Sequence, residues 1–238
     1  MKYYCFLLMT SVLFLVSCSK KEGEGNLHIS GTIKGLKKGT LYIQKIKDTA
    51  LVIIDSIQFN GNEDFTSDLE IKSPEMYYLA LDRGVTRSLD NNLPFFAEAG
   101  AIKIETSLAY FLSEAKISGS KNQTKYEEFK KITSKFNDQN LSLMELKFNA
   151  LKNKNLKMAD SITILQDAIT RRRYLYTTNF ALTNNDFEVA PFVTLSEISD
   201  INIKFLDTIQ KSMSPKVAQS MYGKKLKKFY LERKQVGP

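Results

Sequence analysis

Three short groupings in this 238-residue sequence contain residue types that polar catalysis uses. Ser118 and Lys121 have the spacing of the Ser-x-x-Lys acylation motif, but its companion Ser-Asp-Asn and Lys-Thr-Gly elements do not occur. Asp55 and Ser56 combine an acid with a hydroxyl, yet neighbours on a strand point to opposite faces. His28, the only histidine, is expected to point outward from the first strand, without partners for a metal site. We therefore predict no catalytic set, no metal and no cofactor.

Cys18 is the residue with the clearest chemical role. Lys2 and the apolar run 3–16 have the charged start and the short hydrophobic core of a secretory signal, and the run is too short for a membrane span. The segment LFLVSCSKKE (13–22) looks like a lipobox, where bacterial lipoproteins are cleaved and lipidated on cysteine. An ordinary signal with a nearby cysteine is the alternative. We predict a signal peptide over 1–17, a lipid on Cys18 and a flexible tether over 18–26.

Cleavage and lipidation at Cys18 would determine whether the mature chain keeps a free thiol. Cleavage would remove Cys5, the other of the two cysteines, and would leave 238 − 17 = 221 residues. The mature chain would then have no free thiol for a disulfide, a nucleophile or a metal site. We expect a protein of the cell envelope, anchored to a membrane by lipid, with the outer membrane favoured and a periplasmic or surface-facing orientation.

The net charge of +8 is consistent with a solvated, lysine-rich surface. An exported protein meets little nucleic acid, so we predict no nucleic-acid partner. Two basic segments have alternatives. Side chains at 171–173 splay by about 100° per residue on a helix, which favours a solvated face over an anion site. The basic segment 223–234 is amphipathic, and packing on the preceding helices is favoured over a membrane surface.

Four Asp-Ser/Thr-hydrophobic triplets match a short pattern of bacterial O-glycosylation. They begin at Asp48, Asp55, Asp160 and Asp207. The last two fall in predicted helices, so Thr49 and Ser56 are the better candidates for modification.

Hydrophobic periodicity divides the mature chain into two parts. Residues 27–120 alternate with period two and are interrupted by turn residues such as Asn60-Gly61, which predicts an antiparallel β-sandwich-like domain. Residues 121–238 have helical periodicity. We predict that two helices joined at 152–155 form a hairpin, that 184–186 cap a short helix, and that Ser214-Pro215 opens the last helix. The fold class is α+β, with a C-terminal α-helical domain after the β domain.

The expected faces of the hairpin follow from the same periodicity. Tyr126, Phe129, Ile132 and Phe136 share one side of the first helix, and Met158, Ile162, Leu165, Ile169 and Tyr176 share one side of the second.

Several segments together resemble a family of bacterial envelope lipoprotein domains, domain of unknown function 4369. They are ISGTIKGLKKGTLYI (29–43), IIDSIQFNG (53–61), FFAEAGAIKIE (95–105), ISGSKNQ (117–123) and SPKVAQSMYGKKL (214–226). In that family the domain commonly lies upstream of a thioredoxin-like domain. The present sequence ends where such a domain would begin and has no Cys-x-x-Cys, so we expect either a stand-alone form or a shortened chain.

The leading interpretation is a non-catalytic, lipid-anchored binding or assembly module. Its partners would be the membrane, through the anchor, and an unidentified protein or small ligand. The alternative, which rests on the resemblance, is an accessory subunit of a thiol–disulfide system that supplies in trans the domain its relatives have fused.

Overall fold

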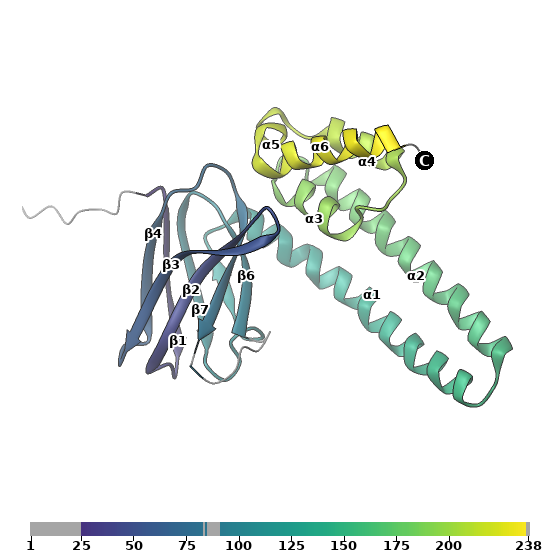
Figure 1. Ribbon diagram of the computed structural model, residues 1–238, viewed down its shortest axis with the longest axis horizontal. Helices are drawn as coiled ribbons and strands as arrows, with labels where there is room; N and C mark the ends of the chain where they lie inside the picture. The colour runs from purple at the N-terminus through teal and green to yellow at the C-terminus, as the bar shows by residue number, and fades with distance from the viewer. Residues whose placement is uncertain (1–24, 83, 85–90, 237–238) are drawn as a thin grey trace, which may run out of the picture.

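The computed structural model describes residues 25–82, 84 and 91–236, and shows a β domain followed by helices (Figure 1). The β domain consists of two four-stranded sheets, ordered β4-β1-β7-β8 and β3-β2-β5-β6. Its strands are β1 Leu27–Lys34, β2 Lys38–Lys47, β3 Ala50–Asn60, β4 Asp64–Leu69, β5 Glu75–Asp82, β6 Asn92–Ala97, β7 Gly100–Ser107 and β8 Lys116–Ser118. The predicted sandwich-like domain is therefore confirmed.

One strand pair departs from the antiparallel prediction. β1 and β7 are parallel, with Leu27 opposite Gly100 and Lys34 opposite Ser107, whereas the other paired strands are antiparallel. The departure has a topological cause. After β1 the chain alternates between the sheets: β2 and β3 join the second sheet, β4 the first, and β5 and β6 the second. β7 then enters the first sheet beside the beginning of β1. Hairpin signals between sequence neighbours do not reveal such a return.

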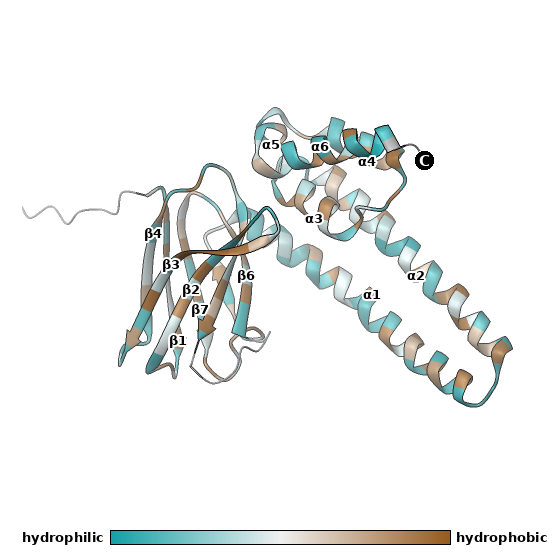
Figure 2. Cartoon of the chain, in the orientation of Figure 1, coloured by the Kyte–Doolittle hydropathy of each residue, from teal (hydrophilic) through white to brown (hydrophobic). Residues whose placement is uncertain are grey.

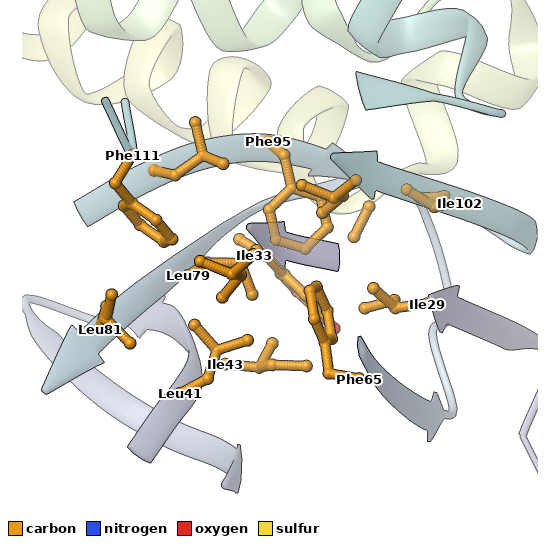
Figure 3. Close-up of a cluster of buried hydrophobic side chains, with 14 of the residues drawn as sticks. Ile29, Ile33, Leu41, Ile43, Phe65, Leu79, Leu81, Phe95, Ile102 and Phe111 are labelled. Carbon is orange, nitrogen blue, oxygen red and sulfur yellow. The ribbon is translucent and has the colours of Figure 1, made fainter. Parts of the chain in front are cut away.

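The core of the β domain lies between the two sheets (Figure 3). In β1 the alternation is direct: Leu27, Ile29 and Ile33 are at most 1% exposed, while the intervening His28 is exposed. Burying each such aliphatic side chain contributes about 1.5–3 kcal/mol. Tyr77 and Phe95, from neighbouring strands, meet edge to face with ring centres 6.0 Å apart. Alternation read from the sequence therefore identifies the inward face correctly.

Asn26, the last residue of the expected tether, is fixed to the β domain. Its side-chain amide donates to the Ile71 carbonyl, and its side-chain oxygen accepts from the Ile71 amide, both at 2.9 Å. Residues 18–24 lie outside the described residues, so the tether upstream of Gly25 stays a prediction.

Six helices follow the β domain. They are α1 Lys121–Lys152, α2 Leu156–Thr183, α3 Val189–Glu197, α4 Ile203–Ser212, α5 Pro215–Gln219 and α6 Met221–Val236. Ser120 caps α1 by accepting from the Gln123 amide, and Asn155 caps α2 by accepting from the Met158 amide. The hairpin predicted at 152–155 is confirmed.

One predicted helix start and the extent of the predicted last helix need correction. Residues 184–186 do not cap α3, because Asn184 ends α2 and the N-cap of α3 is Glu188, which makes no side-chain capping bond. Ser214 caps α5 as predicted, but α5 ends at Gln219 and a separate helix, α6, begins at Met221. The chain is extended at Ser220, which interrupts what periodicity alone presents as one helix.

The predicted helix faces are correct near the β domain and only partly correct towards the hairpin turn. Phe129 is 1% exposed, whereas Met158 and Leu165 are 45% and 53% exposed. Ile162 is buried as predicted, and α2 adds Ala159, outside the predicted face, against Ala150 of α1. Small residues let two helices approach closely, and a pair of helices can bury only the sides that face each other. The remaining apolar positions therefore stay in solvent.

Helices α3 to α6 pack together at the end of α2 that lies nearest the β domain (Figure 1). Leu226 of α6 is fully buried among them, with Phe229 and Tyr230 partly buried beside it. Packing of the basic segment on the preceding helices is thus confirmed. Within the part of the chain that the structure describes, none of the helices combines the length and the apolar character that a membrane span requires.

Candidate functional site

Of the three residues predicted to carry modifications, the structure describes Thr49 and Ser56 but not Cys18. Cys18 lies outside the described residues, so its lipidation stays a prediction. Thr49 is exposed at the turn between β2 and β3, where Asp48 has a φ of 57°. Ser56 is exposed on β3, the edge strand of its sheet. Both hydroxyls are therefore accessible in the fold, and their glycosylation stays a prediction.

Asp55 and Ser56 lie as strand geometry requires. The Asp55 carboxylate accepts from the Ser67 hydroxyl on β4, a buried side chain, while Ser56 points to solvent. The same carboxylate accepts from the Ser56 backbone amide, not from its hydroxyl. The acid is therefore engaged inside the sandwich and does not activate Ser56.

His28 and Ser118 occupy surface positions on strands. His28 pairs with Asp68, its cross-strand partner on β4, and about half of each side chain is exposed. Ser118 is exposed at the end of β8, whereas an acylating serine needs to stand at a helix start, which here is Ser120. Among the described residues, no three His, Cys, Asp or Glu side chains are close enough together to hold a metal ion.

The arginines at 171–173 do not form a shared site. Arg171 and Arg172 are exposed, and Arg173 lies 3.9 Å from Glu197 and over the Tyr174 ring. The three side chains therefore splay as predicted, and one of them covers neighbouring structure.

The β domain and the helices meet at a polar junction around the start of α1. The Glu98 carboxylate, at the end of β6, accepts from the backbone amides of Lys121 at 2.8 Å and Asn122 at 3.2 Å. Those amides have no partners within the helix, and a negative charge is favourable at a helix N-terminus. Gln123 completes the connection by accepting from the Phe96 amide at 2.8 Å. α1 is therefore fastened directly to the edge of the sheet.

Asn122 extends this junction to α3. Its side-chain amide donates to Glu98 at 2.8 Å and to Glu188 at 3.0 Å, and its side-chain oxygen accepts from the Val189 amide at 2.9 Å. Glu188 is 1% exposed, with the Lys216 ammonium 3.6 Å away. A buried carboxylate is tolerated only where such partners are fixed in place. Asn122 therefore links the β domain, α1 and α3 in one network.

An aromatic cluster lies beside the polar junction. The Phe96 ring is fully buried, edge to face with Phe192 at 5.2 Å, Tyr126 at 5.8 Å and Tyr222 at 6.3 Å between ring centres. The Tyr222 hydroxyl accepts from the Met76 amide at 3.1 Å. Burial raises the pKa of Tyr126 to about 12, and burial also raises the pKa of Tyr222. Both hydroxyls thus stay protonated at neutral pH, as a buried interface requires.

Removing the Glu98 cap should loosen the junction without unfolding the protein. For Glu98→Ala, we expect a loss of about 1–2 kcal/mol in the free energy of unfolding, because amides of Lys121 and Asn122 lose a charged acceptor. Urea titration followed by circular dichroism measures the change. Glu114→Ala, which removes an exposed carboxylate bonded to the Ser107 hydroxyl, is the control and should cost less. An equal loss in both variants would contradict the capping role.

Beyond the junction, α1 and α2 form an arm that projects from the body of the molecule (Figure 1). We call residues 137–170, the part towards the turn of the hairpin, the arm. Nine of the seventeen exposed large hydrophobic side chains among the described residues belong to it: Leu141, Met144, Leu146, Phe148, Leu151, Leu156, Met158, Ile164 and Leu165. Figure 2 shows brown, hydrophobic segments along both helices of the arm. This concentration of exposed apolar side chains makes the arm a candidate interaction site.

Residues 27–126 match the protein family described as "Domain of unknown function (DUF4369)". These residues form a domain of that family. The comparison with curated proteins and the comparison with solved structures gave no match. The DUF4369 domain thus comprises the eight strands and the beginning of α1 up to Tyr126, so it contains Glu98, Asn122 and Phe96 of the junction. The arm lies beyond the matched residues.

A cleft of about 490 Å³ opens where the DUF4369 domain meets α3 and α5. Its polar lining includes Lys72, Ser73, Glu98, Asn122, Glu188 and Lys216. Glu98, Asn122 and Glu188 bond to one another as described above, and the Ser73 hydroxyl accepts from the Met221 amide at 3.2 Å. These groups are therefore engaged in fastening the DUF4369 domain to the helices.

Sequence reasoning missed both the junction and the arm. Asn122 and Glu188 are 66 residues apart, and no local pattern connects them. The arm did leave a signal, because Leu141, Met144, Phe148 and Leu151 recur at the spacing of one helical face. That spacing is normally taken as a face buried within the chain.

Proposed function

We propose that this protein is a non-catalytic, lipid-anchored module of the cell envelope that binds or assembles with another protein through the arm. The observation that carries the proposal is the exposed apolar surface of the arm, where side chains such as Phe148 and Leu141 are 68% and 66% exposed. A soluble surface keeps such residues scattered unless they serve an interaction. The junction supports the proposal because it fixes the base of the arm to the DUF4369 domain.

The direction of the arm also supports this function. The β domain, whose first strand β1 begins at Leu27, lies at the opposite end of the molecule from the turn of the hairpin (Figure 1). A lipid on Cys18 would hold the DUF4369 end near the membrane, and the arm would reach away from it. A protein partner is therefore a better occupant of the arm than the anchoring membrane.

The anchor is tested by replacing the acceptor cysteine. For Cys18→Ser, we expect the protein to move from the membrane fraction to the soluble envelope fraction, because no lipid could be attached. Fractionation followed by immunodetection measures the shift. Cys5→Ser serves as the control and should leave the protein with the membrane. A wild-type protein without a lipid-sized mass increase would overturn the anchoring proposal.

The binding role is tested by crosslinking in intact cells and identifying the captured proteins by mass spectrometry. We expect specific adducts with the wild-type protein and their loss in Leu141→Asp/Phe148→Asp. The control Tyr110→Asp changes a comparably exposed residue of the DUF4369 domain, 59% exposed. Adducts that survive the arm substitutions, or no adducts in wild type, would overturn the role of the arm. Capture of a thioredoxin-like protein would favour the alternative, an accessory subunit of a thiol–disulfide system.

A further inference from the structure

One face of α1 within the arm forms a continuous apolar stripe. The stripe consists of Leu141, Met144, Phe148 and Leu151, which are 66%, 54%, 68% and 48% exposed. Their spacing of three, four and three residues places them on one side of the helix, over a length of about 15 Å. α2 does not cover this side, because α1 contacts α2 through Ala150 and Leu143. Among the residues that the structure describes, none covers the stripe, which is thus a second face of a helix that already has one partner.

We propose that the stripe packs against the stripe of a second copy of this chain, with the two α1 helices antiparallel. This inference deepens the proposed function by naming the partner of the arm, and it rests on that function. The resulting contact would join two helical hairpins into a four-helix bundle, in which α1 has a neighbour on both of these faces.

The apolar area of the stripe is the size that such a contact requires. A large apolar side chain offers about 200 Å², so four of them at these exposures present roughly 450 Å². One partner's share of a standard interface is about 800 Å², of which about 65% is apolar in homodimers, or roughly 500 Å². The stripe and its immediate neighbours therefore suffice for a specific dimer.

The charges beside the stripe select the antiparallel orientation. Asp138, Glu145 and Lys152 recur every seven residues and so lie along one edge of the stripe. In a parallel pair this edge would lie on opposite sides of the interface in the two copies, so the three charges could not pair with one another. In an antiparallel pair centred on the stripe, Asp138 faces Lys152 of the second copy, and the reciprocal contact forms by symmetry. Only Glu145, near the two-fold axis, then faces a like charge.

The same edge argues against a lipid surface as the occupant. Two of its three charges, Asp138 and Glu145, would face the phosphates of an anionic bilayer, and only Lys152 would be attracted to them. The arm also points away from the end of the molecule at which an anchor would be attached (Figure 1).

The test is the mass of the full chain in solution, in the Cys18→Ser background, measured by sedimentation equilibrium over a range of concentrations. We expect a dimer for the parent and at least a hundredfold weaker association for Phe148→Asp. Ile164→Asp is the matched control. Ile164 is 66% exposed on α2, two positions from the buried Ile162 and therefore on the far side of that helix. This variant should remain dimeric, and circular dichroism should show all the variants folded.

Charge reversal tests the orientation. Asp138→Lys should weaken association about tenfold by placing lysine opposite Lys152, and Asp138→Lys combined with Lys152→Asp should restore it, because opposite charges face each other again. Failure of the double variant to recover would overturn the antiparallel register. A parent protein that stays monomeric at all concentrations would overturn the proposal. Binding of that monomer to phosphatidylglycerol vesicles would point to a lipid surface as the occupant of the stripe. In that case the proposed function would still be supported if crosslinking in cells captured a protein other than a second copy of this chain, and if the arm variant no longer captured it.

Discussion

Replacing Phe96 by alanine is expected to lower the free energy of unfolding by about 3–5 kcal/mol, the cost of truncating a fully buried aromatic ring. Phe96 contacts rings from α1, α3 and α6, so its removal opens a cavity bordered by three helices. Each edge-to-face contact that is lost adds about 0.5–1.5 kcal/mol beyond area burial. The substitution should therefore weaken mainly the packing of the helices against the DUF4369 domain.

This location gives the experiment a second readout. Urea titration followed by circular dichroism at a helical and at a β wavelength should give coincident transitions for the wild type and separated transitions for Phe96→Ala. Tyr110→Ala is the control, because Tyr110 is 59% exposed and its truncation should cost less than about 0.5 kcal/mol. A Phe96→Ala variant that loses no more stability than this control would refute the central position of the cluster.

The elements of the fold could be predicted well because their signals are local. Alternation in β1 and the polar turn at 152–155 depend only on neighbouring residues, and both predictions were correct. The parallel pairing of β1 with β7 could not be predicted, because it depends on where the chain re-enters the sheet. The break between α5 and α6 is a similar case. The Met221 amide, at the start of α6, donates to Ser73, 148 residues earlier in the sequence.

The candidate site was predictable only in part. Apolar residues at helical spacing predict a covered face, but they do not say whether the cover belongs to the same chain. Leu165 and Phe129 look alike in the pattern, yet Leu165 is 53% exposed and Phe129 is 1% exposed. The difference arises because α3 and the DUF4369 domain reach Phe129, whereas only α1 lies beside the arm portion of α2.

Replacing Gly119 by alanine is expected to be the most damaging single substitution at the junction. Gly119 connects β8 to the N-cap of α1 with a φ of +97°, and a Cβ atom built there would lie 1.9 Å from the Ala101 carbonyl oxygen. No side-chain rotation relieves that contact, because the Ala101 oxygen belongs to the backbone and a Cβ atom is bonded directly to it. The chain must therefore move, which breaks the pairing of β8 with β7 or displaces Ser120 and Glu98 from the start of α1. We expect a loss above about 4 kcal/mol, measured by urea titration.

Gly61 provides a matched control that separates crowding from backbone conformation. Its φ is +96°, nearly the same as that of Gly119, but a Cβ atom there would meet nothing within 4 Å. Gly61→Ala should therefore cost only the strain of a left-handed backbone, about 1–2 kcal/mol. If Gly119→Ala cannot be purified in sufficient yield, the melting temperatures of the two variants can be compared in whole-cell extracts. Gly119→Ala should then melt at a lower temperature than Gly61→Ala. Two variants of equal stability would mean that the contact with Ala101 does not constrain the junction, and that the arm is not held rigidly at this point.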